Sequence, residues 1–158
     1  MKSLNIYKLF TSLAICFFVV SFAGYITKSE VTGWYASLQK PAFNPPSWFF
    51  GPFWSLLYLF LAISFYLVRI SEGETENKRS TIIIFSIQLA LVFSWTLVFF
   101  KLHFIGWTIG IVLTLWLSIL IFIFKSYTLN KWAAYLQIPY LIWIGFTAFY
   151  FITLYFAN

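Results

Sequence analysis

Five long apolar runs, separated by short polar segments, dominate the chain. They cover about residues 5–27, 52–71, 80–100, 105–125 and 132–156. A helix needs about 20 residues to cross roughly 30 Å of hydrocarbon, and each run is about that long. A helix satisfies its own backbone hydrogen bonds inside a bilayer, where water cannot. The pattern therefore predicts an all-α membrane protein, a bundle of five transmembrane helices that forms one membrane domain over residues 1–158.

The segment between the first two runs, residues 28–51, is the most unusual stretch. Trp34 to Tyr58 reads WYASLQKPAFNPPSWFFGPFWSLLY and holds four of the five prolines. Proline fixes φ and lacks an N–H donor, and the residue before a proline favours extended backbone. We therefore expect a stiff, non-helical loop with extended backbone before Pro41, Pro45, Pro46 and Pro52. Loops this long are usually functional, so the sequence predicts a lid over a site.

Composition restricts the chemistry that the chain can perform. It is 62% hydrophobic and only 9% charged, whereas soluble domains carry about 25% charged residues. Cys16 is the only cysteine, His103 the only histidine, and aspartate is absent. An internal disulfide and a Ser-His-Asp triad are excluded, and a multi-ligand metal site is not expected. Nothing in the sequence requires a cofactor.

Charge predicts the orientation in the membrane. One side of the expected bundle holds seven basic residues (Lys2, Lys8, Arg69, Lys78, Arg79, Lys125 and Lys131), and the other holds three (Lys28, Lys40 and Lys101). Basic residues collect on the cytoplasmic side, which predicts a cytoplasmic N-terminus and an outward-facing loop. A retained first helix favours a bacterial inner membrane. The net charge of +6 is expected to meet lipid headgroups, and no nucleic-acid partner is expected.

Aromatic and polar residues recur at helical spacing on three of the runs. Residues three or four apart share a face, so these faces could converge on an aromatic cavity closed by Tyr35 and Pro45. The members are Trp54 and Tyr58 on the second run, Gln88, Val92, Trp95 and Phe99 on the third, and Tyr140, Trp143 and Thr147 on the fifth. Such a cavity would suit a flat, largely apolar ligand. The alternatives are interfacial anchoring by the aromatic rings and an interhelical hydrogen bond by Gln88.

Two further features bear on transport and assembly. The runs contain no acidic residue, which disfavours an ion-coupled transporter. Small residues form ridges that let helix backbones approach closely, either within the bundle or between two copies. These ridges are Ser86, Ala90 and Ser94 on the third run and Gly106 and Gly110 on the fourth.

The motifs in these segments resemble the TspO/MBR family of tryptophan-rich sensory proteins. The pattern WYxxLxKPxxxPPxW followed by FGPxW carries the resemblance through the loop and second run. Matching residues continue along nearly the whole chain: Gln88-Leu89, Trp95, Phe99-Phe100, Pro139-Tyr140-Leu141, Trp143, Phe146 and Asn158. The resemblance implies a five-helix bundle, often a homodimer, whose first long loop covers a ligand pocket.

The resemblance also implies binding of porphyrins, with protoporphyrin IX as the expected ligand. The leading hypothesis is a binding, sensing or translocating protein. A second is an enzyme that degrades porphyrin in light, for which the matching residues are Trp54 and Trp143. A third is a structural partner that joins other membrane proteins through the small-residue ridges.

The chain departs from the family pattern at several positions. Val92 and Phe151 replace family asparagines, Phe43 replaces a tryptophan, and Thr147 replaces an alanine. The loss of a pocket asparagine at Val92 is expected to alter ligand preference. Tyr155 is followed only by Phe156, Ala157 and Asn158, so the cholesterol motif near the C-terminus is incomplete, and we expect weak or no sterol recognition.

Overall fold

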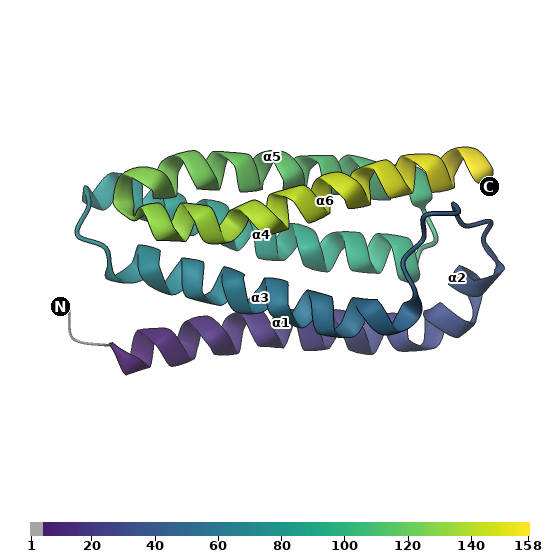
Figure 1. Ribbon diagram of the computed structural model, residues 1–158, viewed down its shortest axis with the longest axis horizontal. Coiled ribbons are helices and arrows are strands. Elements are labelled where there is room, and N and C mark those ends of the chain that lie inside the picture. The colour runs from purple at the N-terminus through teal and green to yellow at the C-terminus, as the bar shows by residue number, and fades with distance from the viewer. Residues whose placement is uncertain (1–4) are drawn as a thin grey trace.

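The computed structural model describes residues 5–158, and these residues fold into helices joined by short connections (Figure 1). The helices are α1 (Ile6–Thr32), α2 (Trp34–Ser37), α3 (Ser47–Ile70), α4 (Thr75–Phe100), α5 (Ile105–Leu129) and α6 (Lys131–Ala157). Within the described residues, all except the short α2 are long and apolar enough to cross a membrane. The prediction of an all-α, five-span protein is confirmed.

The five long helices close into a ring. α1 packs against α3 and α4, α3 also packs against α6, and α5 packs against both α6 and α4. The N-terminal side of α1 and the α3–α4 and α5–α6 turns lie at one end, which we call the basic end (Figure 1). Residues 38–46, the α4–α5 turn and the C-terminus lie at the other, the loop end.

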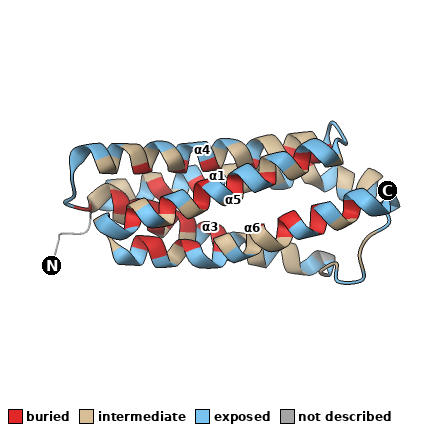
Figure 2. Cartoon of the chain, turned by 90° about the horizontal axis from the view of Figure 1, so that it is seen from above, coloured by how far each residue is buried: buried red, intermediate tan, exposed pale blue. Residues whose placement is uncertain are grey.

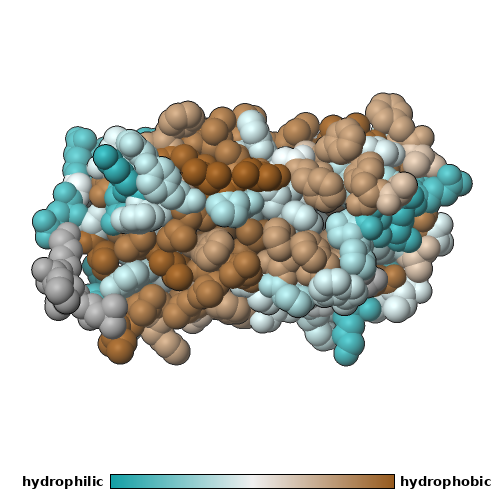
Figure 3. Space-filling view, in the orientation of Figure 1, coloured by the Kyte–Doolittle hydropathy of each residue, from teal (hydrophilic) through white to brown (hydrophobic). Residues whose placement is uncertain are grey.

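The surface has the polarity of a membrane-spanning protein. The face in Figure 3 is hydrophobic over its middle and hydrophilic toward both ends. Large apolar side chains such as Phe18, Trp107 and Phe124 are exposed, and a lipid environment would cover them. At 1.5 Å per residue, helices of 24–27 residues span more than the hydrocarbon thickness of about 30 Å.

A single asparagine makes the sharp turn between α5 and α6. The Oδ1 atom of Asn130 accepts hydrogen bonds from the backbone N–H groups of Trp132 at 3.0 Å and Ala133 at 3.3 Å. Asparagine is a preferred N-cap because its side chain satisfies N–H groups that lack partners within the helix. The turn is therefore short, and α5 and α6 lie antiparallel in close contact.

The expected loop over residues 28–51 is wrong for much of its length. α1 continues to Thr32, α2 follows after Gly33, and α3 begins at Ser47. Within that range, only Gly33 and residues 38–46 lie outside helices, and the longer segment contains Pro41, Pro45 and Pro46. Pro46 has extended backbone and precedes the first residue of α3; the expectation for the residues before Pro41, Pro45 and Pro46 stays a prediction.

The expectation of extended backbone before Pro52 is also wrong, since Pro52 and Gly51 both lie inside α3. Proline removes the bond to the carbonyl four residues earlier, which here belongs to Trp48, near the start of the helix. The usual clash between a proline ring and the preceding side chain is reduced because glycine has no Cβ. Position within the helix and the identity of the preceding residue thus make this proline tolerable.

The packed core lies toward the basic end. Of the described α3 residues, none from Trp48 to Leu56 is buried, whereas Leu57, Tyr58, Leu61 and Phe65 are. Figure 2 shows how the buried positions are distributed along the helices. Near the middle of this core, the rings of Phe65 and Phe85 stack with centroids 4.3 Å apart. α3 is therefore closely packed toward the basic end, whereas its loop-end part borders space.

Polar contacts fix α1 to α3 at the basic end. The Nη1 atom of Arg69 donates to the Lys8 carbonyl at 3.0 Å, to Thr11 Oγ1 at 2.6 Å and to Ser12 Oγ at 3.1 Å. Lys8 Nζ donates in return to the Arg69 carbonyl at 3.2 Å. Hydrogen bonds from a charged donor are stronger than neutral ones, so Arg69 holds together the part of the α1–α3 pair that lies farthest from the loop.

We expect Arg69→Met to lower the Tm of the protein in detergent micelles by about 5 °C, because charged hydrogen bonds to α1 are lost. The matched control is Arg79→Met, since Arg79 is exposed and its replacement should leave the Tm nearly unchanged. Equal losses in the two variants would contradict a specific role for Arg69.

Candidate ligand-binding cavity

A cavity of about 650 Å³ occupies the loop end of the bundle. Its wall is formed by α1, α2, α3, α4, α6 and residues of the 38–46 loop. This volume lies in the range of small-molecule sites, about 300–1,000 Å³. The cavity lies beside the part of α3, Trp48 to Leu56, in which no described residue is buried.

The structure brings most of the sequence-predicted site residues to this one wall. Those that line the cavity are Tyr35, Pro45, Trp54, Tyr58, Val92, Trp95, Phe99, Trp143 and Thr147. They come from three long helices, α2 and the loop, as the helical spacing required. The prediction that these residues contact a ligand stays a prediction.

Gln88 and Tyr140 are predicted site residues that do not line the cavity. Both are fully buried on the side toward the packed core. Gln88 Nε2 donates to the Ser118 carbonyl at 3.1 Å, so its amide joins α4 to α5. This is the interhelical hydrogen bond that the sequence predicted as the alternative to ligand contact. Spacing alone placed them on the right helix faces, but the cavity does not extend as far toward the basic end as those faces do.

Three tryptophans form the aromatic centre of the cavity wall. The Trp54 ring lies 6.1 Å from that of Trp143, nearly perpendicular at 87°. It lies 6.4 Å from the Trp95 ring with an interplanar angle of 27°. Such separations and angles are those that aromatic pairs prefer. The rings thus support one another and present their surfaces to the same space.

The indole N–H groups of Trp95 and Trp143 are buried and lack a hydrogen-bond partner within the described residues. A buried donor without an acceptor costs about 1–3 kcal/mol. A ligand atom that accepts a hydrogen bond from either group, after a small ring movement, would recover that free energy. The wall is therefore aromatic but not chemically uniform.

The wall also includes one face of α1 that the sequence interpretation missed. Phe17, Gly24, Thr27 and Val31 lie three to seven residues apart and all line the cavity. Their helical spacing was a usable signal, but the high hydrophobicity of the whole run concealed it. A Cβ added at Gly24 would meet nothing within 4 Å, so the cavity is open beside this residue.

The loop is fixed to α6 at the cavity by a chain of hydroxyl groups. The Tyr35 hydroxyl donates to Asn44 Oδ1 at 3.1 Å and lies 2.7 Å from the Tyr150 hydroxyl. Burial raises the pKa of Tyr35, although its hydrogen bond with Tyr150 acts in the opposite direction. Tyr35 therefore stays protonated at neutral pH and keeps its bond to the loop.

The C-terminus fixes the other side of the loop. Gln39 N donates to Asn158 Oδ1 at 2.9 Å, and Asn158 Nδ2 donates to the Gln39 carbonyl at 3.2 Å. Phe43 adds a stacked contact with Phe149 at 5.4 Å. The lid is thus a fixed part of the wall, with contacts along its length.

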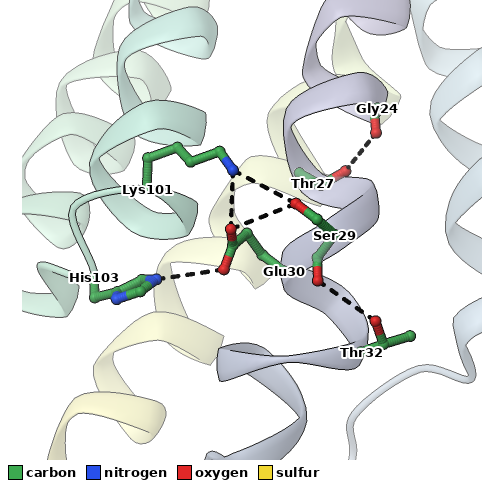
Figure 4. A network of polar contacts seen from close by, with 7 residues as sticks. All are labelled: Gly24, Thr27, Ser29, Glu30, Thr32, Lys101 and His103. Atoms are coloured by element: carbon green, nitrogen blue, oxygen red, sulfur yellow. Dashed lines mark hydrogen bonds and ion pairs between the residues drawn. The ribbon is translucent and has the colours of Figure 1, made fainter.

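An ionic cluster closes the bundle beside α2 (Figure 4). Glu30 Oε1 lies 2.9 Å from Lys101 Nζ, and Glu30 Oε2 lies 3.5 Å from His103 Nε2. The His103 ring also stacks on Trp34, with centroids 4.1 Å apart. These contacts join the end of α1 and the start of α2 to the α4–α5 turn.

Comparison with known proteins gives this architecture a family. The TspO/MBR family profile matches residues 12–156. The chain belongs to the TspO/MBR family. It is therefore an integral membrane protein related to membrane sensors and translocators, and the resemblance inferred from the motifs is confirmed.

Similar proteins come from archaea, bacteria and animals. The tryptophan-rich protein TspO of Archaeoglobus fulgidus is 35% identical over 146 residues, which cover 92% of this chain and 93% of that protein. The translocator protein of Homo sapiens is 36% identical over 115 residues, covering 72% and 68%. The tryptophan-rich sensory protein of Cereibacter sphaeroides is 32% identical over 110 residues, covering 70% and 67%.

Three of the four positions expected to depart from the TspO/MBR pattern lie at the cavity, and the fourth, Phe43, does not line it. Val92, Thr147 and Phe151 all line it, and Phe151 packs edge-on against Phe99 at 4.7 Å. The Thr147 hydroxyl donates to the Trp143 carbonyl of its own helix at 2.8 Å. Its proton is therefore not available for a hydrogen bond to a ligand. Val92 and Phe151 therefore give this part of the wall a largely apolar surface.

We expect Tyr35→Phe to loosen the loop without unfolding the bundle. Loss of a hydrogen-bonding hydroxyl costs about 1 kcal/mol, so amide hydrogen exchange over residues 38–46 should become about fivefold faster. The control is Tyr25→Phe, because Tyr25 is exposed on the surface of α1. Unchanged exchange in the loop would show that the Tyr35 hydroxyl does not hold it.

Proposed function

We propose that this TspO/MBR protein binds a tetrapyrrole, protoporphyrin IX or a close relative, as part of a sensing or translocating role. The observation that carries the proposal is the aromatic cavity, in which Trp54, Trp95 and Trp143 surround one space. A porphyrin macrocycle is flat, broad and largely apolar. Stacking on indole rings is a natural way to bind it.

The openness of the cavity supports a ligand that dissolves in the membrane. Gly24 of α1 and Gly51 of α3 are exposed, line the cavity, and have nothing within 4 Å of an added Cβ. Both lie in helices that face lipid. A hydrophobic ligand would reach the aromatic centre between these helices without crossing the fixed loop.

The distribution of charge supports an orientation with the N-terminus in the cytoplasm. Among described residues, the basic end holds Lys8, Arg69, Lys78, Arg79, Lys125 and Lys131, and the loop end holds Lys28, Lys40 and Lys101. The positive-inside rule then directs the cavity toward the outer leaflet. We propose a bacterial inner membrane as the location and a homodimer as the assembly, through the small-residue ridge of α4, where Ser86 and Ala90 are exposed.

The position of two tryptophans also favours a second candidate function. Trp54 and Trp143 are in contact at 6.1 Å, so a porphyrin stacked on one lies beside the other. A porphyrin excited by light, with molecular oxygen as the oxidant, would find electron-rich indole rings at van der Waals distance. The alternative function is therefore light-dependent porphyrin degradation with these residues at the reacting site.

We expect Gly24→Leu to weaken protoporphyrin IX binding about tenfold, because a leucine side chain would occupy space at the open side of the cavity. Quenching of tryptophan fluorescence in the dark measures the Kd. Gly110→Leu is the matched control: it also replaces an exposed helical glycine with nothing within 4 Å of its Cβ, but on α5, away from the cavity. Equal affinities in the two variants would place the ligand elsewhere.

We expect Trp54→Phe with Trp143→Phe to separate the two candidate functions. Phenylalanine keeps an aromatic face for stacking, so the Kd in the dark should rise only a few-fold, about 1 kcal/mol. The measurement is porphyrin absorbance under steady illumination, before and after the double substitution. If the parent protein bleaches bound porphyrin in light and the double variant does not, the result supports the enzyme. If the parent protein does not accelerate bleaching, the result supports a binding protein without this activity.

A further inference from the structure

We propose that Lys40 binds a carboxylate of the ligand, so that the cavity selects flat aromatic acids over neutral molecules of the same shape. The inference rests on the proposed function, and it specifies which part of a tetrapyrrole lies at the loop end. It follows from the position of one charge in an otherwise uncharged wall.

Lys40 is the only charged residue among the described residues that line the cavity. The rest of the wall is aromatic, aliphatic or neutral polar. Lys40 is partly buried, and a charge that is partly removed from water interacts more strongly with an opposite charge than one in bulk water does. Lys40 thus gives the cavity a net positive charge at the loop end.

The structure holds the Lys40 ammonium close to the aromatic wall. Its Nζ lies 4.8 Å from the centroid of the Tyr35 ring. It donates to the carbonyl of Ala36 at 3.1 Å and to that of Leu38 at 3.4 Å. An ammonium has three N–H donors, so two of them are used by backbone carbonyls and one remains for a ligand.

No acidic side chain is placed to neutralise Lys40. The chain has only four acidic residues. Glu72, Glu74 and Glu76 lie at or beside the α3–α4 turn, at the basic end. The remaining acid, Glu30, pairs with Lys101 and His103 (Figure 4). Among the described residues, Lys40 therefore has no ion pair, and a carboxylate on the ligand would supply one.

The neighbours of Lys40 favour an anion as well. The Asn44 Oδ1 atom already accepts a hydrogen bond from Tyr35, so the remaining capacity of Asn44, which also lines the cavity, is the donor capacity of its amide nitrogen. Lys40 and Asn44 both contact Tyr35, so a carboxylate bound by Lys40 would lie on the side of the cavity where Asn44 also offers a donor. The ligand would then lie with its acidic groups at the loop and its apolar ring among Trp54, Trp95 and Trp143.

The test compares protoporphyrin IX with its dimethyl ester, which keeps the macrocycle but removes both negative charges. Binding of each is measured in the dark by fluorescence quenching in a non-ionic detergent at pH 7. We expect the parent protein to bind the diacid about tenfold more tightly than the ester, as for one charge-assisted hydrogen bond. In Lys40→Met the two affinities should become equal, mainly through weaker binding of the diacid.

Two further variants serve as controls. Lys40→Arg keeps the charge and should keep the preference for the diacid, which excludes a fault in folding as the cause. Lys28→Met removes an exposed cation at the same end that does not line the cavity. It should leave the preference unchanged, which excludes a general effect of surface charge.

The outcomes separate this inference from the proposed function. If the diacid and ester bind the parent protein equally, or if Lys40→Met keeps the preference, the role of Lys40 is wrong while porphyrin binding stands. If neither compound gives saturable quenching, porphyrin binding itself is wrong, and the assignment of Lys40 falls with it.

Discussion

Hydrocarbon offers no hydrogen-bond partner to a peptide group, and the rest of this structure depends on that constraint. It requires each span to be a continuous helix that satisfies its own backbone. Five such helices, joined by short turns, close into a ring. A ring of straight helices can fill its centre only where side chains interlock, as they do around Phe65 and Phe85. Where they do not, a space remains.

That space is the cavity, and its position follows from the unequal packing of α1 and α3. Arg69 and the buried residues that begin at Leu57 hold the two helices together at the basic end. Toward the loop end, Gly24 of α1 and Gly51 of α3 line the cavity and leave open space beside them. Trp54 of α3, Trp95 of α4 and Trp143 of α6 then supply the aromatic wall. The site is thus a consequence of incomplete packing, bordered by rigid aromatic rings.

Several polar groups at the loop end bond to other groups of the protein. Glu30 neutralises Lys101 and contacts His103, Asn158 pairs with the backbone of Gln39, and Tyr35 joins the loop to α6. Among the described residues, Lys40 is the charge that lines the cavity, and no ion pair is described for it. A cavity with aromatic walls and a cation at its mouth is suited to ligands that combine a flat apolar body with an acidic edge. TspO/MBR relatives that differ at these positions should differ in what they select.

The sequence by itself determined the class of fold and most of the wall. Apolar runs of about 20 residues predict spans because length and hydrophobicity alone decide whether a segment can cross a bilayer. The spacing of Trp54, Trp95 and Trp143 identified the faces that meet, since helical geometry is local. Only the tertiary structure decided that Gln88 and Tyr140 lie outside the cavity, that α1 contributes a face, and that Lys40 lacks an acidic partner. Those facts depend on where helices diverge and on which distant charges pair, and neither is encoded in the periodicity of a single segment.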